Sequence, residues 1–298
     1  MTKHKIHAST VCLHLFFILI SLCFLIPMVM VISISLSSET WVNSGGYSLI
    51  PHEFSLDAYK LAFNNPKQIL SAYGVTIAQS VLGTLVSMVV AGMAAYPLSR
   101  SNFRFKKPIT LLIFFTMLFS AGMVPSYITL TKYYHLGNSF WIYIIPGMTG
   151  GAWNTMVYRT FFKGLPESLF EAARIDGAKE LYIFFRIVIP LSTPVFASLG
   201  FMTLVGKWND YTTSMIYIRD ESLYTLQFLL QRILNEADFL SKMAQEGSVV
   251  GVDISAYRRP AETLKYALCV IAAGPMLLVF PFFQKYFSQG LTIGAVKG

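Results

Sequence analysis

Six long apolar runs, separated by polar loops, dominate the amino-acid sequence. Each is about as long as the 20 residues that a helix needs to cross the hydrocarbon core of a bilayer, which is about 30 Å thick. The central parts of the runs hold no Asp, Glu, Lys or Arg except Arg159, which lies near one end. The pattern therefore predicts an all-α integral membrane protein with six transmembrane helices, at residues 11–36, 73–98, 108–130, 140–162, 187–205 and 266–283.

The first apolar run follows Lys3 and Lys5, an arrangement that also occurs in secretory signals. A cleaved signal has an apolar region of about 7–15 residues, followed by a small-residue cleavage site. The run at 11–36 is longer than that, and no such site follows it cleanly. We therefore expect an uncleaved first span.

The composition also favours a membrane protein. The chain is 54% hydrophobic and 13% charged, whereas soluble domains carry about 25% charged residues. Its net charge of +8 comes from basic residues beside the apolar runs, which is typical of orientation signals and argues against nucleic-acid binding. Cys12, Cys23 and Cys269 all fall inside apolar runs, so we expect neither a disulfide framework nor a metal motif.

The distribution of Lys and Arg predicts the orientation. The N-terminus, residues 100–107, residues 159–186 and the C-terminus together hold 13 of the 23 basic residues, and the two short loops on the other side hold three. The long loop 206–265 holds the remaining seven, but long loops cross the membrane largely regardless of charge. Both termini are therefore expected in the cytoplasm.

This orientation divides the chain into five regions. They are a cytoplasmic N-terminus (1–10), a first span (11–36), an extracytoplasmic loop (37–72), a main transmembrane domain (73–287) and a cytoplasmic tail (288–298). The main domain contains a cytoplasmic loop, 163–187, and an extracytoplasmic loop, 206–265. In the latter, the stretch "LYTLQFLLQRILNEADFL" has apolar residues at helical spacing, which favours an amphipathic helix on the bundle over a dedicated docking element.

The cytoplasmic loop "GLPESLFEAARIDGAKELYIFFRIVIP" predicts a short helix, a sharp turn and a longer helix. Pro166 suits a first helical position, and Glu167 suits the positive end of the helix dipole. Gly177 supplies the left-handed position that ends such a helix. The second helix is expected to run from about Lys179 to Pro190 and to continue into the fifth span.

The short helix has a predicted apolar face and a predicted ion pair. Leu169, Phe170, Ala172 and Ala173 are expected to form the apolar face, and Glu171 is spaced to pair with Arg174. A partner protein that gripped a helix held in this way would move the span behind it. By residue chemistry alone, an ordinary interfacial helix with a charged outer side fits equally well.

One motif in this loop resembles a known signature. Glu171-Ala172-Ala173, then Gly177, nine further residues and the segment 187–190 ("IVIP") resemble the signature loop of ABC importer permeases, with Ile189 in place of the usual Leu. The tail "GLTIGAVKG" resembles that of the maltose-type permease subunit, and "SAGMVPSYI" and "WND" also fit this carbohydrate-uptake family. Within this family, the sequence most resembles permeases for complex or uronate-containing oligosaccharides.

The resemblance implies a type I ABC importer permease fold and a set of partners. These are two cytoplasmic ATPase subunits, a second and non-identical permease subunit, an extracytoplasmic solute-binding protein and an oligosaccharide substrate. ATP and Mg would be bound by the ATPases, because this chain has no P-loop: "GFMTLVGKW" has the wrong spacing and no Ser or Thr after its Lys. The chain itself is expected to be non-catalytic, without a cofactor or metal, and to lie in a bacterial cell membrane.

The resemblance also assigns roles to residues. The positions implied to couple to the ATPases are Glu171, Ala172, Ala173, Asp176 and Gly177 in the loop, and Gly294 and Lys297 in the tail. Sugar sites combine aromatic faces with amides and hydroxyls, so the substrate-pathway candidates are Trp153, Asn154, Trp208, Asn209 and Tyr211. For each candidate the alternative is an interface-belt aromatic or a packing amide.

Three other classes of function compete with sugar import. An ABC permease for a peptide, an amino acid or phosphate would share the loop signature. An ion-coupled secondary transporter commonly carries ionisable groups within its spans, which this chain nearly lacks. An intramembrane enzyme is disfavoured, because the sequence has no H-E-x-x-H, no G-x-S-x-G and no G-D pair. Import of a peptide, an amino acid or phosphate therefore stays open as an alternative, and the tail and the long first outer loop favour sugar.

Overall fold

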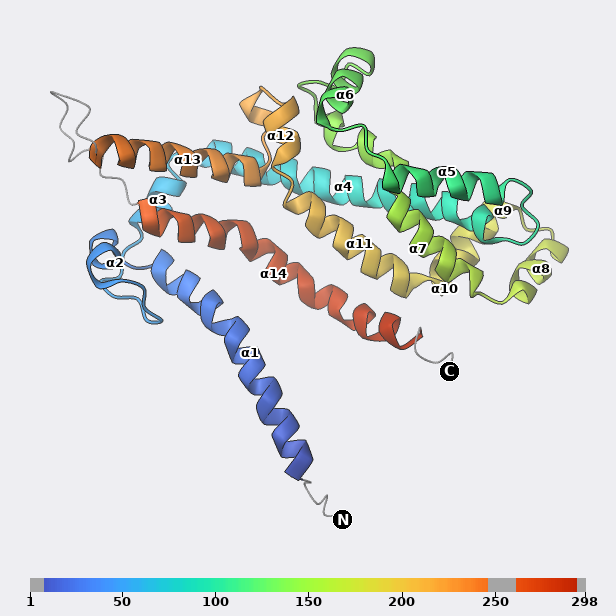
Figure 1. Cartoon of the computed structure of the whole chain (residues 1–298), viewed down its shortest axis with the longest axis horizontal. Coiled ribbons are helices and arrows are strands. Elements are labelled where there is room, and N and C mark those ends of the chain that lie inside the picture. Colours follow the sequence, from blue (N-terminus) through green and yellow to red (C-terminus); the bar gives the residue numbers. More distant parts are fainter. Residues whose placement is uncertain (1–7, 246–260, 294–298) are drawn as a thin grey trace. The chain divides into compact units, whose positions relative to one another are not determined.

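The computed structural model describes residues 8–245 and 261–293, which are almost entirely helical (Figure 1). In this part of the chain the extended structure is limited to one isolated bridge, between Ser37 and Phe54. The described residues fall into two compact units. Unit 1 comprises Met1–Pro66 with Leu230–Pro275, and unit 2 comprises Lys67–Leu229 with Met276–Gly298. The all-α fold predicted from the apolar runs is confirmed.

Unit 1 contains the first predicted span. Helix α1 (Ala8–Ser35) is followed by α2 (Glu39–Gly45) and α3 (Asp57–Ala62). The apolar stretch of α1 has no residue buried against the rest of the chain. Because a helix satisfies its own backbone hydrogen bonds, such a segment is stable in lipid without protein neighbours. The expected first span is therefore present as a helix.

A carboxylate from α2 caps a helix that begins far along the chain. Glu39 accepts hydrogen bonds from the backbone N–H groups of Glu262 and Thr263, at 3.0 and 2.8 Å, and from the Thr263 hydroxyl at 2.8 Å. These are the first residues of α14 (Ala261–Ile293). Since the first N–H groups of a helix have no partner within it, a carboxylate there is favourable. This contact fixes the start of α14 within unit 1.

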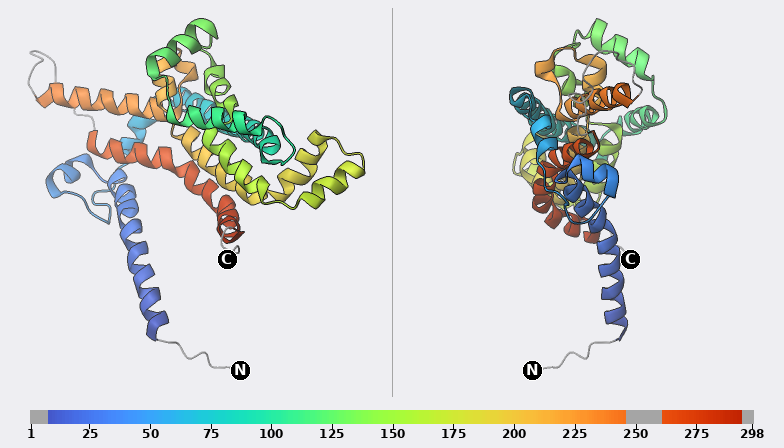
Figure 2. Two further views of the ribbon diagram at one scale, coloured as in Figure 1. Left: turned by 45° about the vertical axis from the view of Figure 1, so that its right-hand side comes forward. Right: turned by 90° about the vertical axis from the view of Figure 1, so that its left-hand side faces the viewer.

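Unit 2 is built around α4 (Pro66–Ser99), with α7 (Ala152–Lys163) and α11 (Thr193–Trp208) beside it (Figure 2). Ala91 and Ala95 are fully buried on α4, and small residues of this kind let helices approach closely. A layer of aromatic rings completes the core: the rings of Tyr158 and Phe196 lie 4.5 Å apart between centroids. This packed end of unit 2 positions the loop at residues 163–187.

The prediction of a single helix at 108–130 is wrong. The structure has α5 (Lys106–Leu118), α6 (Met123–Ile128) and the π-helical turn η1 (Thr129–Tyr133). The two halves meet at 113°. At the break Gly122 has φ +84, a conformation that other residues rarely adopt. The run is apolar throughout, so its hydropathy does not reveal the bend.

The prediction of a single helix at 140–162 is also wrong. Two short 3₁₀ segments, η2 (Phe140–Tyr143) and η3 (Ile145–Thr149), precede α7. Gly150 and Gly151, at φ +73 and +70, separate η3 from α7. A side chain on Gly150 would lie 2.7 Å from the backbone nitrogen of Ala91, so the chain turns here against α4 with no space for a Cβ.

The long helix expected to continue into the fifth span is bent. Helix α9 (Glu180–Ile183), the π-helical turn η4 (Phe184–Val188) and α10 (Ile189–Leu191) lead to Ser192, and α11 continues from there at an angle of 84°. Pro190 and Pro194 flank the bend, and proline removes a backbone donor from a helix. The predicted continuity therefore fails at Ser192.

The remaining elements are α12 (Thr212–Tyr217), η5 (Glu221–Leu223) and α13 (Leu226–Gln245). The helix predicted in the long loop is confirmed as α13. By length and composition, α1, α4 and α14 could each cross a membrane, and the count among the described residues rises to five if each bent pair is one span.

Candidate coupling site

The short helix predicted in the loop at residues 163–187 is present as α8 (Glu167–Ile175). Pro166 directly precedes it rather than occupying its first position, Glu167 lies in its first turn and Arg174 in its last. Gly177 follows at φ +80, its N–H donating to the Arg174 carbonyl at 3.0 Å, and the N–H of Ala178 donates to the Ala173 carbonyl at 2.9 Å. This pair of bonds is a Schellman motif, which ends a helix sharply. The prediction that Gly177 ends this helix in a left-handed conformation is confirmed.

One residue of α8 anchors it in the core of unit 2. Phe170 is fully buried, and its ring lies 6.2 Å from that of Tyr96 near the end of α4. The Arg100 guanidinium lies over the Phe170 ring, 4.1 Å from its centroid. Aromatic and cation–π contacts of this kind are strengthened by desolvation. Helix α8 is therefore packed rather than lying loosely on the surface.

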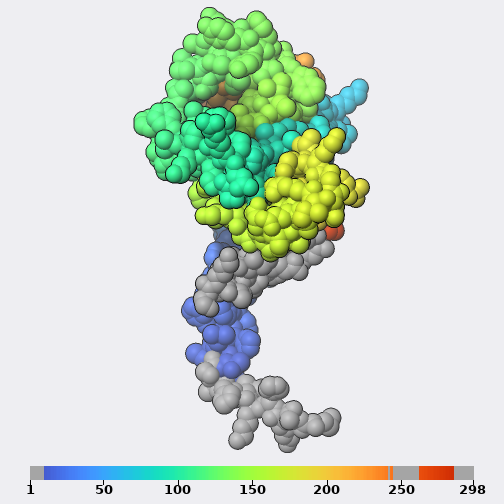
Figure 3. Space-filling model, turned by 90° about the vertical axis from the view of Figure 1, so that its right-hand side faces the viewer, coloured from blue at the N-terminus to red at the C-terminus, as the bar shows by residue number. Residues whose placement is uncertain are grey.

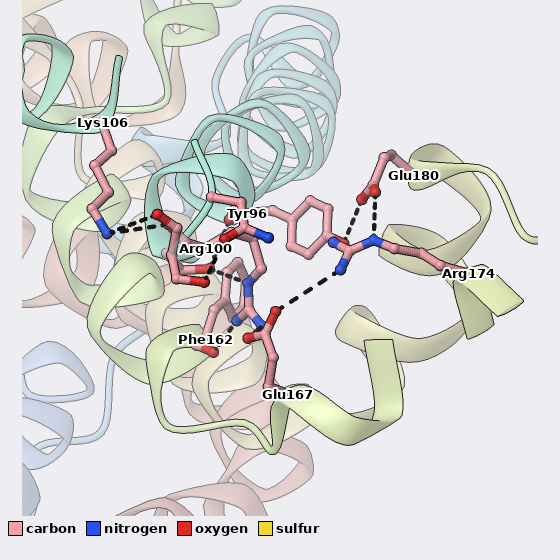
Figure 4. Close-up of polar contacts among 10 residues, drawn as sticks. Tyr96, Arg100, Lys106, Phe162, Glu167, Arg174 and Glu180 are labelled. Carbon is pink, nitrogen blue, oxygen red and sulfur yellow. Dashed lines mark hydrogen bonds and ion pairs between the residues drawn. The ribbon is translucent and has the colours of Figure 1, made fainter. Parts of the chain in front are cut away.

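Arg100 joins three elements (Figure 4). It is 5% exposed, and it donates to Glu167 at 3.0 Å, to the Ser99 hydroxyl at 3.0 Å and to the carbonyl of Phe162. Burial lowers the pKa of Arg100, and the nearby Glu167 opposes this shift. The guanidinium thus ties the ends of α4 and α7 to the start of α8.

A second ion pair closes the loop on the other side of Gly177. Arg174 donates to Glu180 at 2.9 Å, and the Tyr96 hydroxyl donates to the other oxygen of this carboxylate at 2.7 Å (Figure 4). Hydrogen bonding to Glu180 raises the pKa of Arg174. Among the described residues Arg174 pairs with Glu167 and Glu180, so the expected pair with Glu171 is wrong.

The predicted coupling residues lie mainly on the outer side of α8. Glu171, Ala172 and Asp176 are exposed, and so is Gly177 at the turn. Of the predicted apolar face, Phe170 is buried and Ala173 is half-buried against the core, whereas Leu169 and Ala172 are exposed, so half of that face was predicted wrongly. Figure 3 shows this segment, in yellow, at the surface of unit 2. The predicted tail contacts Gly294 and Lys297 lie outside the described residues.

The sequence missed several residues of this site. Ile175 is 85% exposed at the end of α8, next to the predicted residues. Tyr96, Arg100 and Glu180 hold the helix in place, but Arg100 lies 67 positions before its partner Glu167. Sequence spacing contains no signal for such a contact. The exposed Ile175 could have been found, because it falls on the side of the helix opposite Phe170 at 3.6 residues per turn.

The substrate-pathway candidates do not share one environment. Trp153 is 64% exposed at the start of α7, whereas Trp208 is 5% exposed and its ring lies 6.5 Å from that of Tyr73. Asn154 donates to Thr203 on α11 at 3.3 Å, and Asn209 donates to the Val205 carbonyl at 2.9 Å. Tyr211 is exposed. Trp153 and Tyr211 are therefore accessible to a ligand, whereas Trp208, Asn154 and Asn209 contact other residues of the chain.

Helix α8 lies between helices α7 and α11 along the chain, packed on one side and exposed on the other. This arrangement suits a membrane permease that contacts a partner protein. Comparison of the sequence with known families agrees: residues 83–293 match the family described as binding-protein-dependent transport system inner membrane component. The chain belongs to this family.

Individual relatives extend the match to almost the whole chain. The polygalacturonan/rhamnogalacturonan transport system permease protein YtcP of Bacillus subtilis is 38% identical over 283 residues, which cover 95% of this chain and 96% of the relative. Protein LplC of the same organism is 35% identical over 274 residues, or 92% of this chain and 90% of the relative. A crystal structure of a bacterial ABC transporter involved in importing the acidic polysaccharide alginate contains a chain that matches with a TM-score of 0.75, at 26% identity, over 96% of this chain and 99% of that one.

Proposed function

We propose that this chain is the permease subunit of an ATP-driven, binding-protein-dependent importer of oligosaccharides in a bacterial cell membrane. The observation that carries the proposal is the division of α8 into two sides. Phe170 and Arg174 fix one side to the chain's own core, and Glu171, Ala172 and Ile175 are exposed on the other. A helix fixed in this way transmits a force applied at its outer side to the ends of α4 and α7.

The partner on the outer side is a cytoplasmic ATPase subunit. An exposed isoleucine beside a carboxylate and a small residue suits a groove with an apolar floor, because such anchors account for most of the binding energy of small interfaces. The complete importer has two such ATPases, a second permease subunit and an extracytoplasmic binding protein. In this assembly the chain has six spans and cytoplasmic termini, and Trp153, Asn154, Trp208, Asn209 and Tyr211 contribute to the sugar pathway.

The cargo is an oligosaccharide that contains uronic acid. The names of two matched proteins support this class: one relative is called a polygalacturonan/rhamnogalacturonan permease, and the similar solved chain comes from an importer of alginate. Both polymers carry carboxylates on their sugar rings, so a shared acidic chemistry is the simplest explanation for the likeness of the permeases.

The docking role is tested by replacing the exposed anchor. We expect Ile175→Ser to reduce co-purification of the ATPase with this chain, while the chain still inserts and folds. Phe105→Ser is the matched control, because Phe105 is also exposed, on the loop between α4 and α5. Equal recovery of the ATPase with both variants would contradict the assignment of α8.

The cargo is tested with the complete importer in proteoliposomes. An oligogalacturonide and a malto-oligosaccharide of equal length are supplied with the binding protein, and ATP hydrolysis is measured for each. We expect stimulation by the acidic sugar alone. Stimulation by the neutral sugar alone would place the cargo among uncharged oligosaccharides, and stimulation by neither would exclude both classes.

A further inference from the structure

A cavity of about 560 Å³ opens where the end of α4 meets α5 and α7. None of the predicted coupling residues lines it, although one lining residue, Ser99, accepts a hydrogen bond from Arg100. Its wall combines four basic side chains with apolar ones. The lining residues are Leu98, Ser99, Lys106, Lys107, Thr110, Leu111, Phe114, Met156, Arg159 and Lys163.

The cavity carries an uncompensated positive charge. Lys106, Lys107, Arg159 and Lys163 line it, and no Asp or Glu among the described residues does. None of the four forms an ion pair with a carboxylate elsewhere in the part of the chain that the structure describes. Lys106 and Lys107 also occupy the first turn of α5, which has no acidic residue. Because the N-terminal end of a helix is itself partly positive, two lysines there are unfavourable unless an anion is present.

One further polar group, the Thr110 hydroxyl, lies at the cavity, and backbone carbonyls hold two of the basic side chains there. The Thr110 hydroxyl oxygen is buried and has no hydrogen-bond partner among the described residues. Arg159 donates from Nε to the Leu98 carbonyl at 3.1 Å, which holds the guanidinium at the wall. Lys106 reaches the carbonyls of Arg100 and Ser101 only at 3.4 Å (Figure 4). A bound anion would give the buried Thr110 hydroxyl an acceptor.

The other wall of the cavity is apolar and open. Leu111 is 69% exposed on α5, Phe114 is exposed one turn further on, and Met156 lies on α7. A free inorganic anion would gain nothing from these side chains, whereas a molecule with a charged head and a hydrocarbon chain would contact both walls. Basic pockets between membrane helices are known to bind anionic head groups.

We propose that this cavity binds the head-group phosphate of an anionic phospholipid. The phosphate lies among Lys107, Arg159 and Lys163 and accepts the Thr110 hydroxyl, and the acyl chains run along Leu111 and Phe114. The proposal requires that α5 lies in the membrane, but it does not depend on the cargo or on the ATPase contact of α8.

The test uses the full chain, in the complex in which it is isolated, placed in nanodiscs of phosphatidylcholine with a small fraction of spin-labelled phosphatidylglycerol. The fraction of immobilised label is compared between the wild type and Lys107→Gln/Lys163→Gln. We expect binding about thirtyfold weaker in the double variant, from the affinity that two basic side chains contribute toward anionic lipid.

Two matched variants separate a site from a general charge effect. Lys107→Arg/Lys163→Arg keeps both charges and should retain binding. Arg104→Gln removes an exposed charge from the same loop, outside the cavity lining, and should leave binding unchanged. Equal losses in Arg104→Gln and in the double variant would overturn the proposal, as would equal immobilisation of labelled phosphatidylcholine.

Competition with inorganic phosphate distinguishes a lipid site from a site for the free anion. If millimolar phosphate displaces the labelled lipid as effectively as unlabelled phosphatidylglycerol does, the cavity is a site for free phosphate and the lipid assignment is wrong. We expect displacement by the lipid alone, because only the lipid also contacts the apolar wall.

Discussion

Arg100 fixes the position of α8 from a distance along the chain. Its guanidinium contacts Glu167, the Phe162 carbonyl and the face of the Phe170 ring. Replacing it by glutamine leaves Glu167 and a buried carbonyl without their donor, and disruption of a buried ion pair costs about 3–5 kcal/mol. Since Glu167 is partly exposed, we expect a loss of about 2 kcal/mol in the free energy of unfolding.

The measurement is the melting temperature of the purified complex, together with the number of ATP molecules hydrolysed per sugar imported. We expect Arg100→Gln to lower the first and to raise the second, because α8 would no longer move with α4 and α7. Arg104→Gln, a change of the same charge in the same loop, should alter neither. A normal transport ratio in Arg100→Gln would rule out its positioning role.

Gly177 is constrained by its backbone and not by its neighbours. Its φ is +80, yet a Cβ added there would meet no atom within 4 Å. This conformation costs a residue with a Cβ about 1–2 kcal/mol of conformational free energy, and it costs asparagine less. We therefore expect Gly177→Val to abolish uptake while membrane insertion stays intact, and Gly177→Asn to retain most of it.

The control for Gly177 is Gly74→Ala, since Gly74 also has open space around it but lies in α4 with an ordinary helical φ. This variant should transport normally in a vesicle uptake assay. Uptake at the wild-type rate by Gly177→Val would show that the turn does not transmit force.

The elements of the loop differ in how far the sequence predicts them. Helix α8 and its end were predictable, because the signals (Glu167, Phe170, Gly177) are all local. The bend at Ser192 and the break before α7 were missed, because apolar composition continues through both. Pro190, Pro194 and the Gly150-Gly151 pair are local signals of a break, but they do not give its angle. Likewise, the pair of Arg174 with Glu180 depends on a turn whose geometry exists only once α8 has packed.

At the break between η3 and α7, two adjacent glycines separate the effect of backbone strain from the effect of steric contact with α4. Gly150 and Gly151 both have positive φ, but only Gly150 contacts the backbone of Ala91, whereas a Cβ on Gly151 would find the Asn154 amide at 3.9 Å. We expect Gly150→Ala to cost about 1–3 kcal/mol more than Gly151→Ala, since overpacking adds to the backbone strain that both share.

Thermal unfolding of the two variants in the same detergent measures this difference. The chemical change and the type of backbone conformation are matched, so each variant serves as the control for the other. Equal melting temperatures would mean that α4 yields to the added methyl group and that the close approach is not rigid.

For the whole molecule, the orientation in the membrane is open to direct test. In a background with Cys12, Cys23 and Cys269 replaced by serine, Ser44→Cys introduces a single thiol in α2 and Ser168→Cys introduces one in α8, both at exposed positions. The predicted topology places the first outside and the second inside the cell.

A membrane-impermeant maleimide should therefore label Ser44→Cys in intact cells, and Ser168→Cys only after permeabilisation. The reverse pattern would invert the topology, and labelling of both thiols in intact cells would remove the cytoplasmic loop from contact with any ATPase. Recovery of labelling after permeabilisation is the control for the accessibility of each thiol.

The two sides of α8 differ in which gene can carry a mutation that suppresses a defect there. Phe170 meets only residues encoded by the same gene, whereas Ile175 extends away from them. In a screen for restored growth on the imported sugar, a defect at Ile175 or Glu171 is open to suppression by a second mutation in the ATPase gene. A defect at Phe170 or Arg100 is open to suppression only within this gene, so the side that a residue occupies sets which locus can compensate for it.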